Sequence, residues 1–285
     1  MPVAIEPQVA LAWIERVGQE TRRRVRDELA IEEPLEIRVD GRPLAVTMRT
    51  PGEDEELAVG FLVGEALIAG RDDVTAVGPT PDLAANTVEI RTRSGLRRDP
   101  AAERAFHLTS SCGVCGKAAL EHVRLYAGRG ANAGIPATGD APLLDPELIR
   151  EIPARARAAQ RSFERTGALH ATGLFGPFGE LLVLREDVGR HNAMDKAIGA
   201  MLLAGRHPLP GVVACLSGRV SFELVQKAVL AGLAGIVAVG GPTSLAVELA
   251  EEHGLVLCGF ARDGAFNVYS GAALVGDDVP PQTAL

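Results

Sequence analysis

The chain has 285 residues, of which 47% are hydrophobic and 23% are charged, as expected for a soluble globular protein with one large or two smaller domains. Its formal net charge of −8 argues against general binding to nucleic-acid backbones, and one Trp and two Tyr are too few for a surface that stacks bases. No apolar run approaches the roughly 18 residues of a membrane span, and no targeting signal is visible. We therefore expect a cytoplasmic protein without nucleic-acid or membrane partners.

The N-terminal residues 8–29 are predicted to form a helix, because Val9, Trp13 and Val17 recur at intervals of four. The arginines from Arg22 to Arg26 are interpreted as a solvated face of that helix, with a docking patch as the alternative.

The next part of the chain is expected to form a small α+β unit. Asp40-Gly41 between two alternating apolar runs is a strong hairpin signal. The expected elements are strands at 35–39 and 44–48, a helix at 53–68, a strand at 87–91 and a charged loop at 93–105.

The remaining residues are expected to form a larger α/β unit. The expected elements are a helix at 117–126, a linker at 128–142, a helix at 146–163, strands at 168–175 and 181–184, a helix at 194–202, a strand at 211–216, a helix at 224–229, a strand at 236–239, a helix at 243–253 and a strand at 255–261. This alternation predicts right-handed crossovers and a largely parallel sheet covered by helices.

Cys112 and Cys115 form a C-x-x-C pair, with a glycine after each cysteine and Lys117 just beyond. A thiol acts as a nucleophile in its thiolate form, and a helix N-terminus or a nearby cation lowers its pKa. The pair could carry a disulfide, pass on a persulfide or supply two of four zinc ligands.

The zinc alternative lacks a second pair of ligands, since Cys215 and Cys258 lie apart in apolar runs and are interpreted as buried hydrophobic residues. The thioredoxin-like alternative lacks a buried strand directly before the pair. Sulfur or redox chemistry is the preferred interpretation, with zinc binding and a chance pair as alternatives. A single C-x-x-C also fits a reducing compartment.

Polar clusters follow successive strands of the larger unit. In open α/β sheets ligands bind beyond the carboxyl ends of the strands, where helix N-termini face anions. The clusters therefore predict a site for a nucleotide or a pyrophosphate, although an ordinary helix cap or a single core histidine would explain any one of them. No dinucleotide-binding, P-loop or zinc-deaminase sequence pattern is present. The clusters lie at 165–170, 186–196, 216–219, 240–244 and 260–264.

Many short segments follow one another in a recognisable order. They are Glu33 to Leu35, Met48 to Gly52, Asp54 to Leu57, Ser110 to Lys117, Arg165 to Gly167, Glu186 to Lys196, Arg219 to Glu223, Pro242 to Glu248, Gly259 to Arg262 and Asn267 to Tyr269. Over about residues 32–275 the sequence thereby resembles the FdhD family of sulfur-carrier proteins.

The resemblance implies that a cysteine desulfurase delivers sulfur as a persulfide to the C-x-x-C pair, with Cys112 bearing the sulfur and Cys115 as its partner. The sulfur then passes to the molybdenum cofactor, in its bis(molybdopterin guanine dinucleotide) form, before insertion into a molybdenum-dependent formate dehydrogenase. The expected cofactor contacts, from the family's segment after the last strand and from the strand-end clusters, are Phe260, Ala261, Arg262, Asp263, Gly264, Ala265, Ser217 and Arg219.

The resemblance also implies a homodimer and a cytidine deaminase-like three-layer α/β domain without the zinc site, hence no metal ion of its own. The expected division is an N-terminal extension at 1–31, the small α+β unit at 32–109 and the α/β domain at 110–285. The sequence departs mildly from the family at Gly240-Gly241, where Ser-Ala is more usual, and at Glu65-Ala66-Leu67. The alternatives are a molybdopterin-nucleotide-binding chaperone with non-catalytic cysteines and a dithiol oxidoreductase.

Overall fold

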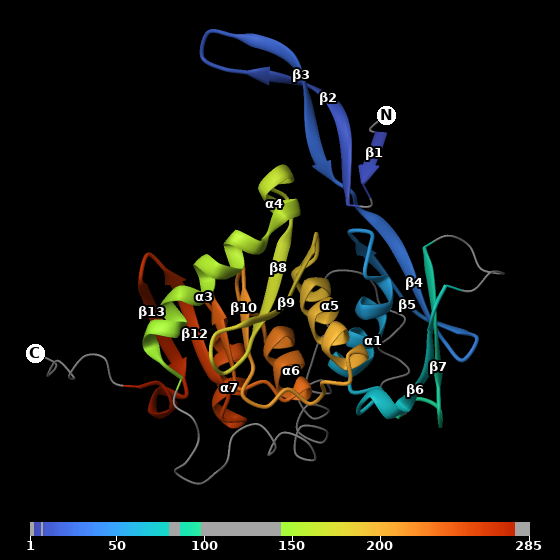
Figure 1. Cartoon of the computed structure of the whole chain (residues 1–285), viewed down its shortest axis with the longest axis vertical. Helices are drawn as coiled ribbons and strands as arrows, with labels where there is room; N and C mark the ends of the chain where they lie inside the picture. The colour runs from blue at the N-terminus through green and yellow to red at the C-terminus, as the bar shows by residue number, and fades with distance from the viewer. Residues whose placement is uncertain (1–2, 7, 80–85, 98–143, 277–285) are drawn as a thin grey trace, which may run out of the picture.

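The computed structural model describes residues 3–6, 8–79, 86–97 and 144–276. These residues form three β-sheets, of three, four and six strands (Figure 1). The predicted helix at 117–126 and the linker at 128–142 lie outside the described residues.

The six-stranded sheet has the order β13-β12-β11-β10-β8-β9. Its strands are β8 (His170–Phe175), β9 (Leu181–Asp187), β10 (Val213–Leu216), β11 (Gly235–Ala238), β12 (Val256–Arg262) and β13 (Ala265–Ser270). Only β10, β11 and β12 are parallel to one another; β8, β9 and β13 pair antiparallel. The expectation of a largely parallel sheet was wrong, because a hairpin closes each side of a short parallel centre.

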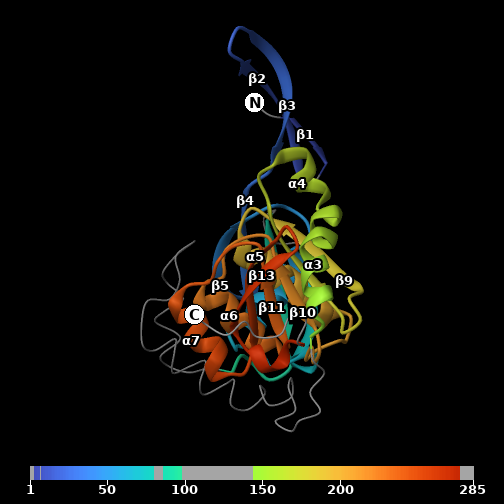
Figure 2. The same cartoon turned by 90° about the vertical axis from the view of Figure 1, so that its left-hand side faces the viewer.

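Helices cover both faces of this sheet. Alternate residues of the central strands belong to different cores, with Ala214 packed on one side and Cys215 on the other. The helix α3 (Pro146–Ala159) packs on the second side, and α5 (Arg190–Leu203), α6 (Phe222–Ala231) and α7 (Ser244–Glu252) pack on the first (Figure 2). The predicted helix at 146–163 is interrupted at Gln160, after which α4 (Arg161–Thr166) begins.

The four-stranded sheet lies beside this domain and has the order β5-β4-β7-β6. Its elements are β4 (Glu33–Val39), β5 (Arg42–Arg49), α1 (Asp54–Gly64), the 3₁₀ turn η1 (Arg71–Asp73), β6 (Val74–Gly78) and β7 (Thr87–Thr92). The predicted hairpin, helix and strand are confirmed, and β6 is an additional strand. The helix α1 packs on this sheet and also on α5 and α6, so one apolar core runs through both sheets.

Two glycines bring α1 and α5 into close contact. A β-carbon on Gly60 would lie 1.8 Å from the carbonyl oxygen of Asp195, and one on Gly199 would lie 1.9 Å from that of Glu56. The two helices therefore touch backbone to backbone at this crossing, which no larger residue would permit.

The N-terminal residues form strands, not the predicted helix. After the short strand β1 (Val3–Glu6), β2 (Val9–Val17) and β3 (Arg22–Ala30) pair antiparallel around a turn at Gly18. The interval of four between Val9, Trp13 and Val17 fits a helix, but it is also a multiple of two and places the same residues on one face of a strand. A projecting ribbon results, seen at the top of both views (Figures 1 and 2).

Candidate functional site

The predicted sulfur-bearing pair, Cys112 and Cys115, lies outside the described residues. The other two cysteines are free thiols buried in β10 and β12. Burial raises the pKa of Cys215 and of Cys258 to about 12. Both thiols are thus protonated at neutral pH and shielded from solvent, as the sequence predicted for buried hydrophobic cysteines, and neither is suited to nucleophilic chemistry.

Three predicted clusters meet at the carboxyl ends of the parallel strands. Ser217 follows β10, Gly240 follows β11, and Phe260 lies near the end of β12. Backbone hydrogen bonds connect them, since Gly240 N donates to the Gly218 oxygen at 3.1 Å and Phe260 N donates to the Gly240 oxygen at 3.2 Å. The structure therefore brings Ser217, Arg219 and Phe260 to one edge of the sheet.

A fourth cluster reaches this edge because β8 runs antiparallel to β10. The start of β8 thereby lies beside the end of β10, where Ala171 N donates to the Ser217 hydroxyl at 2.9 Å and Ser217 N donates to the Ala171 oxygen at 3.1 Å. The preceding residue, His170, stands over Gly218, with ring atoms 3.4 Å from the point where a β-carbon would lie.

The strand ends form a surface of bare backbone, which we call the glycine floor (Gly218, Gly240 and Gly241). A β-carbon on Gly240 would lie 2.9 Å from Arg219 N and from the Gly218 oxygen, so only glycine fits there. A β-carbon on Gly241 would lie 2.6 Å from Cζ of Phe260. The Phe260 ring therefore rests over Gly241 at one end of the floor, and His170 stands at the other.

Phe260 adopts a strained backbone conformation. Its φ of 52° is rare for a bulky residue, and such strain is concentrated at functional sites. The β12–β13 register shifts at this point, between Gly259 and Arg262. The shift leaves the Phe260 side chain 43% exposed beside the floor instead of packed against the sheet.

The rest of the predicted cofactor segment divides into two parts. Ala261 is buried in the core beneath α3 and cannot contact a ligand at the floor. Arg262, Asp263, Gly264 and Ala265 form the exposed turn between β12 and β13, with positive φ at Asp263 and Gly264. Of this segment, Phe260 is the residue that the structure places directly at the floor.

Positive charge gathers around His170. Burial lowers its pKa, and the nearby Arg190, His191 and Arg219 lower it further. Arg190 and His191 are the first residues of α5. A site with two arginines, a helix N-terminus and exposed backbone is suited to an anion such as a phosphate.

A second histidine joins two helix starts. His191 Nε2 lies 2.8 Å from the Glu223 carboxylate and 3.1 Å from the Ser221 hydroxyl. The hydrogen bond from His191 lowers the pKa of Glu223. These contacts tie the start of α5 to the start of α6, beside the floor.

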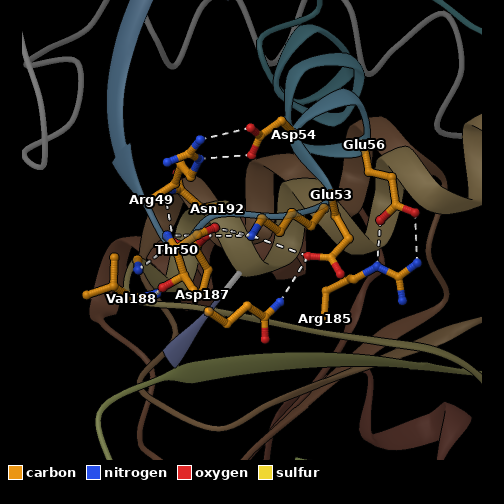
Figure 3. Close-up of polar contacts among 12 residues, drawn as sticks. Arg49, Thr50, Glu53, Asp54, Glu56, Arg185, Asp187, Val188 and Asn192 are labelled. Atoms are coloured by element: carbon orange, nitrogen blue, oxygen red, sulfur yellow. Dashed lines mark hydrogen bonds and ion pairs between the residues drawn. The ribbon is translucent and has the colours of Figure 1, made fainter. Parts of the chain in front are cut away.

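Other polar residues of the 186–196 cluster turn inward and serve structure. Asp187 is fully buried and accepts hydrogen bonds from the backbone of Thr50 at 3.1 Å and from Asn192 at 3.0 Å (Figure 3). Lys196 Nζ lies 2.9 Å from Asp187 and donates to the Thr50 oxygen at 2.8 Å. These contacts fasten the turn after β5 to the start of α5. The sequence did not predict them, because the 186–196 cluster was expected to bind a ligand.

The described ranges hold no group of three or more metal-ligating side chains, and none of their helices is long and apolar enough to cross a membrane.

Sequence comparisons relate this chain to a known protein family. A family model described as the FdhD/NarQ family matches residues 30–275. A protein of Streptomyces avermitilis named Sulfur carrier protein FdhD is 50% identical over 252 residues, covering 86% of this chain and 88% of its own. One of the same name from Mycobacterium tuberculosis is 46% identical over 256 residues, covering 86% of this chain and 91% of its own.

A solved structure shares the architecture. A crystal structure of a Desulfotalea psychrophila protein described as a formate dehydrogenase accessory protein superposes with a TM-score of 0.72, at 22% identity, over 94% of this chain and 100% of that one. Because the family model covers most of the sequence and relatives are close to half identical, the chain belongs to the FdhD/NarQ family.

Proposed function

We propose that this protein is a sulfur carrier that accepts sulfur from a cysteine desulfurase and passes it to the molybdenum cofactor before the cofactor enters a formate dehydrogenase. Its family and the names of its relatives support the carrier chemistry. The observation that carries the cofactor half of the proposal is the glycine floor. Its bare backbone, the Phe260 ring and the charges near His170 suit a ligand with planar rings and phosphates, as a molybdopterin guanine dinucleotide has.

The first chemical step needs no outside oxidant. The Cys112 thiolate attacks the terminal sulfur of the donor's persulfide, so that a new S–S bond forms at Cys112 and the donor leaves as a thiolate. Delivery of that sulfur as sulfide requires two electrons. The Cys115 thiolate attacks Sγ of the Cys112 persulfide, so that a Cys112–Cys115 disulfide forms, the S–S bond of the persulfide breaks and the outer sulfur leaves as hydrosulfide.

We also infer that the larger domain is a cytidine deaminase-like three-layer α/β fold without the zinc site. Its support is a mixed sheet with α3 on one face and α5, α6 and α7 on the other. The buried free thiols of Cys215 and Cys258, together with a single C-x-x-C in the sequence, fit action in the cytoplasm.

The test is mass spectrometry of protein incubated with a cysteine desulfurase and cysteine. We expect one added sulfur on the peptide that contains Cys112, and none in Cys112→Ala. The matched controls are Cys215→Ala and Cys258→Ala, which should still gain sulfur because both buried thiols stay protonated. Cys112→Ala should also fail to restore formate dehydrogenase activity in cells that lack their own carrier.

The alternatives give other results. A chaperone with non-catalytic cysteines would bind the cofactor but gain no sulfur. A dithiol oxidoreductase would cycle between the dithiol and a Cys112–Cys115 disulfide with turnover of a disulfide substrate. Sulfur retained in Cys112→Ala would show that the nucleophile lies elsewhere.

A further inference from the structure

The ribbon of β2 and β3, which we call the N-terminal arm, lies almost wholly outside the family match, which begins at residue 30. The two strands pair without a break from Val9 opposite Ala30 to Val17 opposite Arg22. Both views show the arm projecting away from the two larger sheets (Figures 1 and 2). A two-stranded ribbon is only marginally stable alone in water, so we expect another surface to cover and stabilise it.

The base of the arm is held firmly. The Glu28 carboxylate accepts two hydrogen bonds of 2.8 Å from the guanidinium of Arg165 at the end of α4. Gln8 accepts from the Ser162 hydroxyl at 2.6 Å and donates to Glu53 at 3.3 Å. The arm is thus fixed in direction at its root and presented as an ordered element.

The middle of the arm displays an apolar anchor, since Trp13 pairs with Arg26 halfway along the two strands. Trp13 is 57% exposed, and the guanidinium groups of Arg24 and Arg26 each lie 5.1 Å from its ring centroid. These cation–π contacts hold the indole in place before any partner arrives. Tryptophan and arginine are the residues most enriched at the energetic centres of interfaces, and a pre-ordered side chain loses little freedom on docking.

The charge of the arm is opposite to that of the rest of the chain. Residues 9–30 have an excess of one positive charge, which leaves an excess of nine negative charges on the remainder of a chain whose net charge is −8. Arg16 and Arg22 form ion pairs within the arm. Within the described ranges, Arg23, Arg24 and Arg26 form no ion pair.

These observations select the partner. The arm points away from its own body, and two arms laid face to face would bring their arginines together. An acidic body of the same chain is complementary in charge, and a two-fold axis would let each copy hold the other. We propose that the N-terminal arm docks on the acidic body of a second copy of this chain, with Trp13 as the anchor and Arg24 and Arg26 as its charged flanks.

The proposal names the surface of the dimer that the family resemblance implies, and it does not depend on sulfur chemistry. Failure of dimer formation and failure of persulfide formation are therefore separate results.

The experiment is sedimentation velocity of the full chain over a range of concentrations. We expect the wild type to be a dimer whose dissociation constant rises with salt, because exposed charges are screened. Trp13→Ala should raise that constant about thirtyfold, as for a central interface residue. The double variant Arg24→Glu with Arg26→Glu should give a monomer, whereas Trp13→Tyr should largely keep the dimer.

Two control variants match the exposure of Trp13. Val46 is 58% exposed and the Arg91 side chain 57%, both on the four-stranded sheet. Val46→Ala and Arg91→Glu should leave the dimer unchanged, and circular dichroism should show the same melting of the body in all variants. In the wild type, hydrogen exchange at β2 and β3 should slow as concentration rises, which tests the arm without any substitution.

Several results would overturn the proposal. One is a wild-type monomer at every concentration, and another is a dimer that the Trp13 and arginine substitutions leave intact. A third is an unchanged dimer in which these substitutions impair sulfur transfer from the desulfurase, since the arm would then bind a different protein.

Discussion

Phe260 combines strain with exposure at the edge of the sheet. A bulky residue with a φ of 52° costs roughly 1–3 kcal/mol of backbone free energy, which the surrounding structure must offset. The ring is held over Gly241 and gains little burial there. This combination fits a side chain kept in place for a ligand rather than for the core.

Substitutions in the glycine floor should separate ligand binding from stability. Gly241→Ala would push the Phe260 ring aside and should weaken binding of guanosine diphosphate, measured by calorimetry, by about three- to tenfold. Gly240→Ala would meet backbone atoms at 2.9 Å, which cannot swing away, and should lower the free energy of unfolding by about 1–3 kcal/mol.

A double-mutant cycle tests whether Gly241 affects guanosine diphosphate binding through the Phe260 ring. If Gly241 acts through the Phe260 ring, Gly241→Ala should have no further effect on binding once Phe260→Ala has removed that ring. Additive losses in the double variant would contradict this role.

Lys227 is a buried cation shared by two carboxylates. Its ammonium group lies 2.8 Å from Asp195 and 3.6 Å from Glu65. Burial acts to lower the pKa of Lys227, but the two carboxylates outweigh it and the pKa is raised. Burial raises the pKa of Asp195 and of Glu65. One buried ammonium therefore faces two carboxylic acids.

Lys227→Met should be destabilising in a pH-dependent way. It leaves Asp195 buried without its cation, which costs about 3–5 kcal/mol of unfolding free energy near neutral pH. The folded state then binds a proton more tightly than the unfolded state. Stability should therefore rise as pH falls from the raised pKa of Asp195 toward its ordinary value of 3.8. Urea unfolding at several pH values measures this.

A second substitution, at Asp195, is the control for the pH dependence of Lys227→Met. Asp195→Asn in the Lys227→Met background should recover part of the lost stability and flatten the pH profile, because the buried negative charge is gone. A profile with the same slope in both variants would exclude Asp195 as the titrating group.

At the scale of elements, the crossing of α1 and α5 joins the two larger sheets. Gly60→Ala and Gly199→Ala should each lower the free energy of unfolding by about 3 kcal/mol or more, since the added β-carbons would fall within 2 Å of the carbonyl oxygens of Asp195 and Glu56, at 1.8 and 1.9 Å. The control is Gly70→Ala, whose β-carbon would have no neighbour nearer than 3.9 Å. Equal stability of Gly60→Ala and Gly70→Ala would contradict this view of the crossing.

The sequence predicted those elements whose signals are local. Asp40-Gly41 marked the β4–β5 hairpin, and the helices expected at 194–202, 224–229 and 243–253 correspond to α5, α6 and α7 of the structure. The arm was missed because the spacing of Val9, Trp13 and Val17 satisfies both a helix and a strand. The antiparallel pairing of β8 with β10 joins distant segments, which spacing along the chain does not encode. The strand β13 was missed although its pairing is local, since it forms a hairpin with β12 in which Arg262 lies opposite Ala265.

The sequence predicted part of the candidate site, as it did part of the fold. Strand ends pointed to Ser217, Arg219 and Phe260, which the structure brings together. The position of His170 beside Gly218 could not be predicted without knowing that β8 runs antiparallel to β10. Asp187 and Lys196 looked like ligand-binding residues in the sequence but pair with each other in the interior, because only packing determines which way each side chain of a polar cluster faces.

At the scale of the whole molecule, one core serves both larger sheets. Leu57 and Leu62 of α1 belong to the same apolar cluster as Met194 and Ile198 of α5. The ion pair between Glu56 and Arg185 joins α1 to β9, and the Thr50–Asp187–Lys196 contacts bridge the same boundary (Figure 3). The glycine floor therefore rests on a body whose two sheets cannot move apart without opening its interior.

The shared core also affects the order in which the chain acquires structure during synthesis. The helix α1 emerges from the ribosome early, yet its partner α5 ends at Leu203, well over a hundred residues later. Until then the side of α1 that faces α5 has no apolar cover from its own chain. The four-stranded sheet and α1 can complete their packing only after the second half of the protein has been synthesised. The nascent polypeptide is therefore exposed to aggregation and to capture by chaperones for much of its translation.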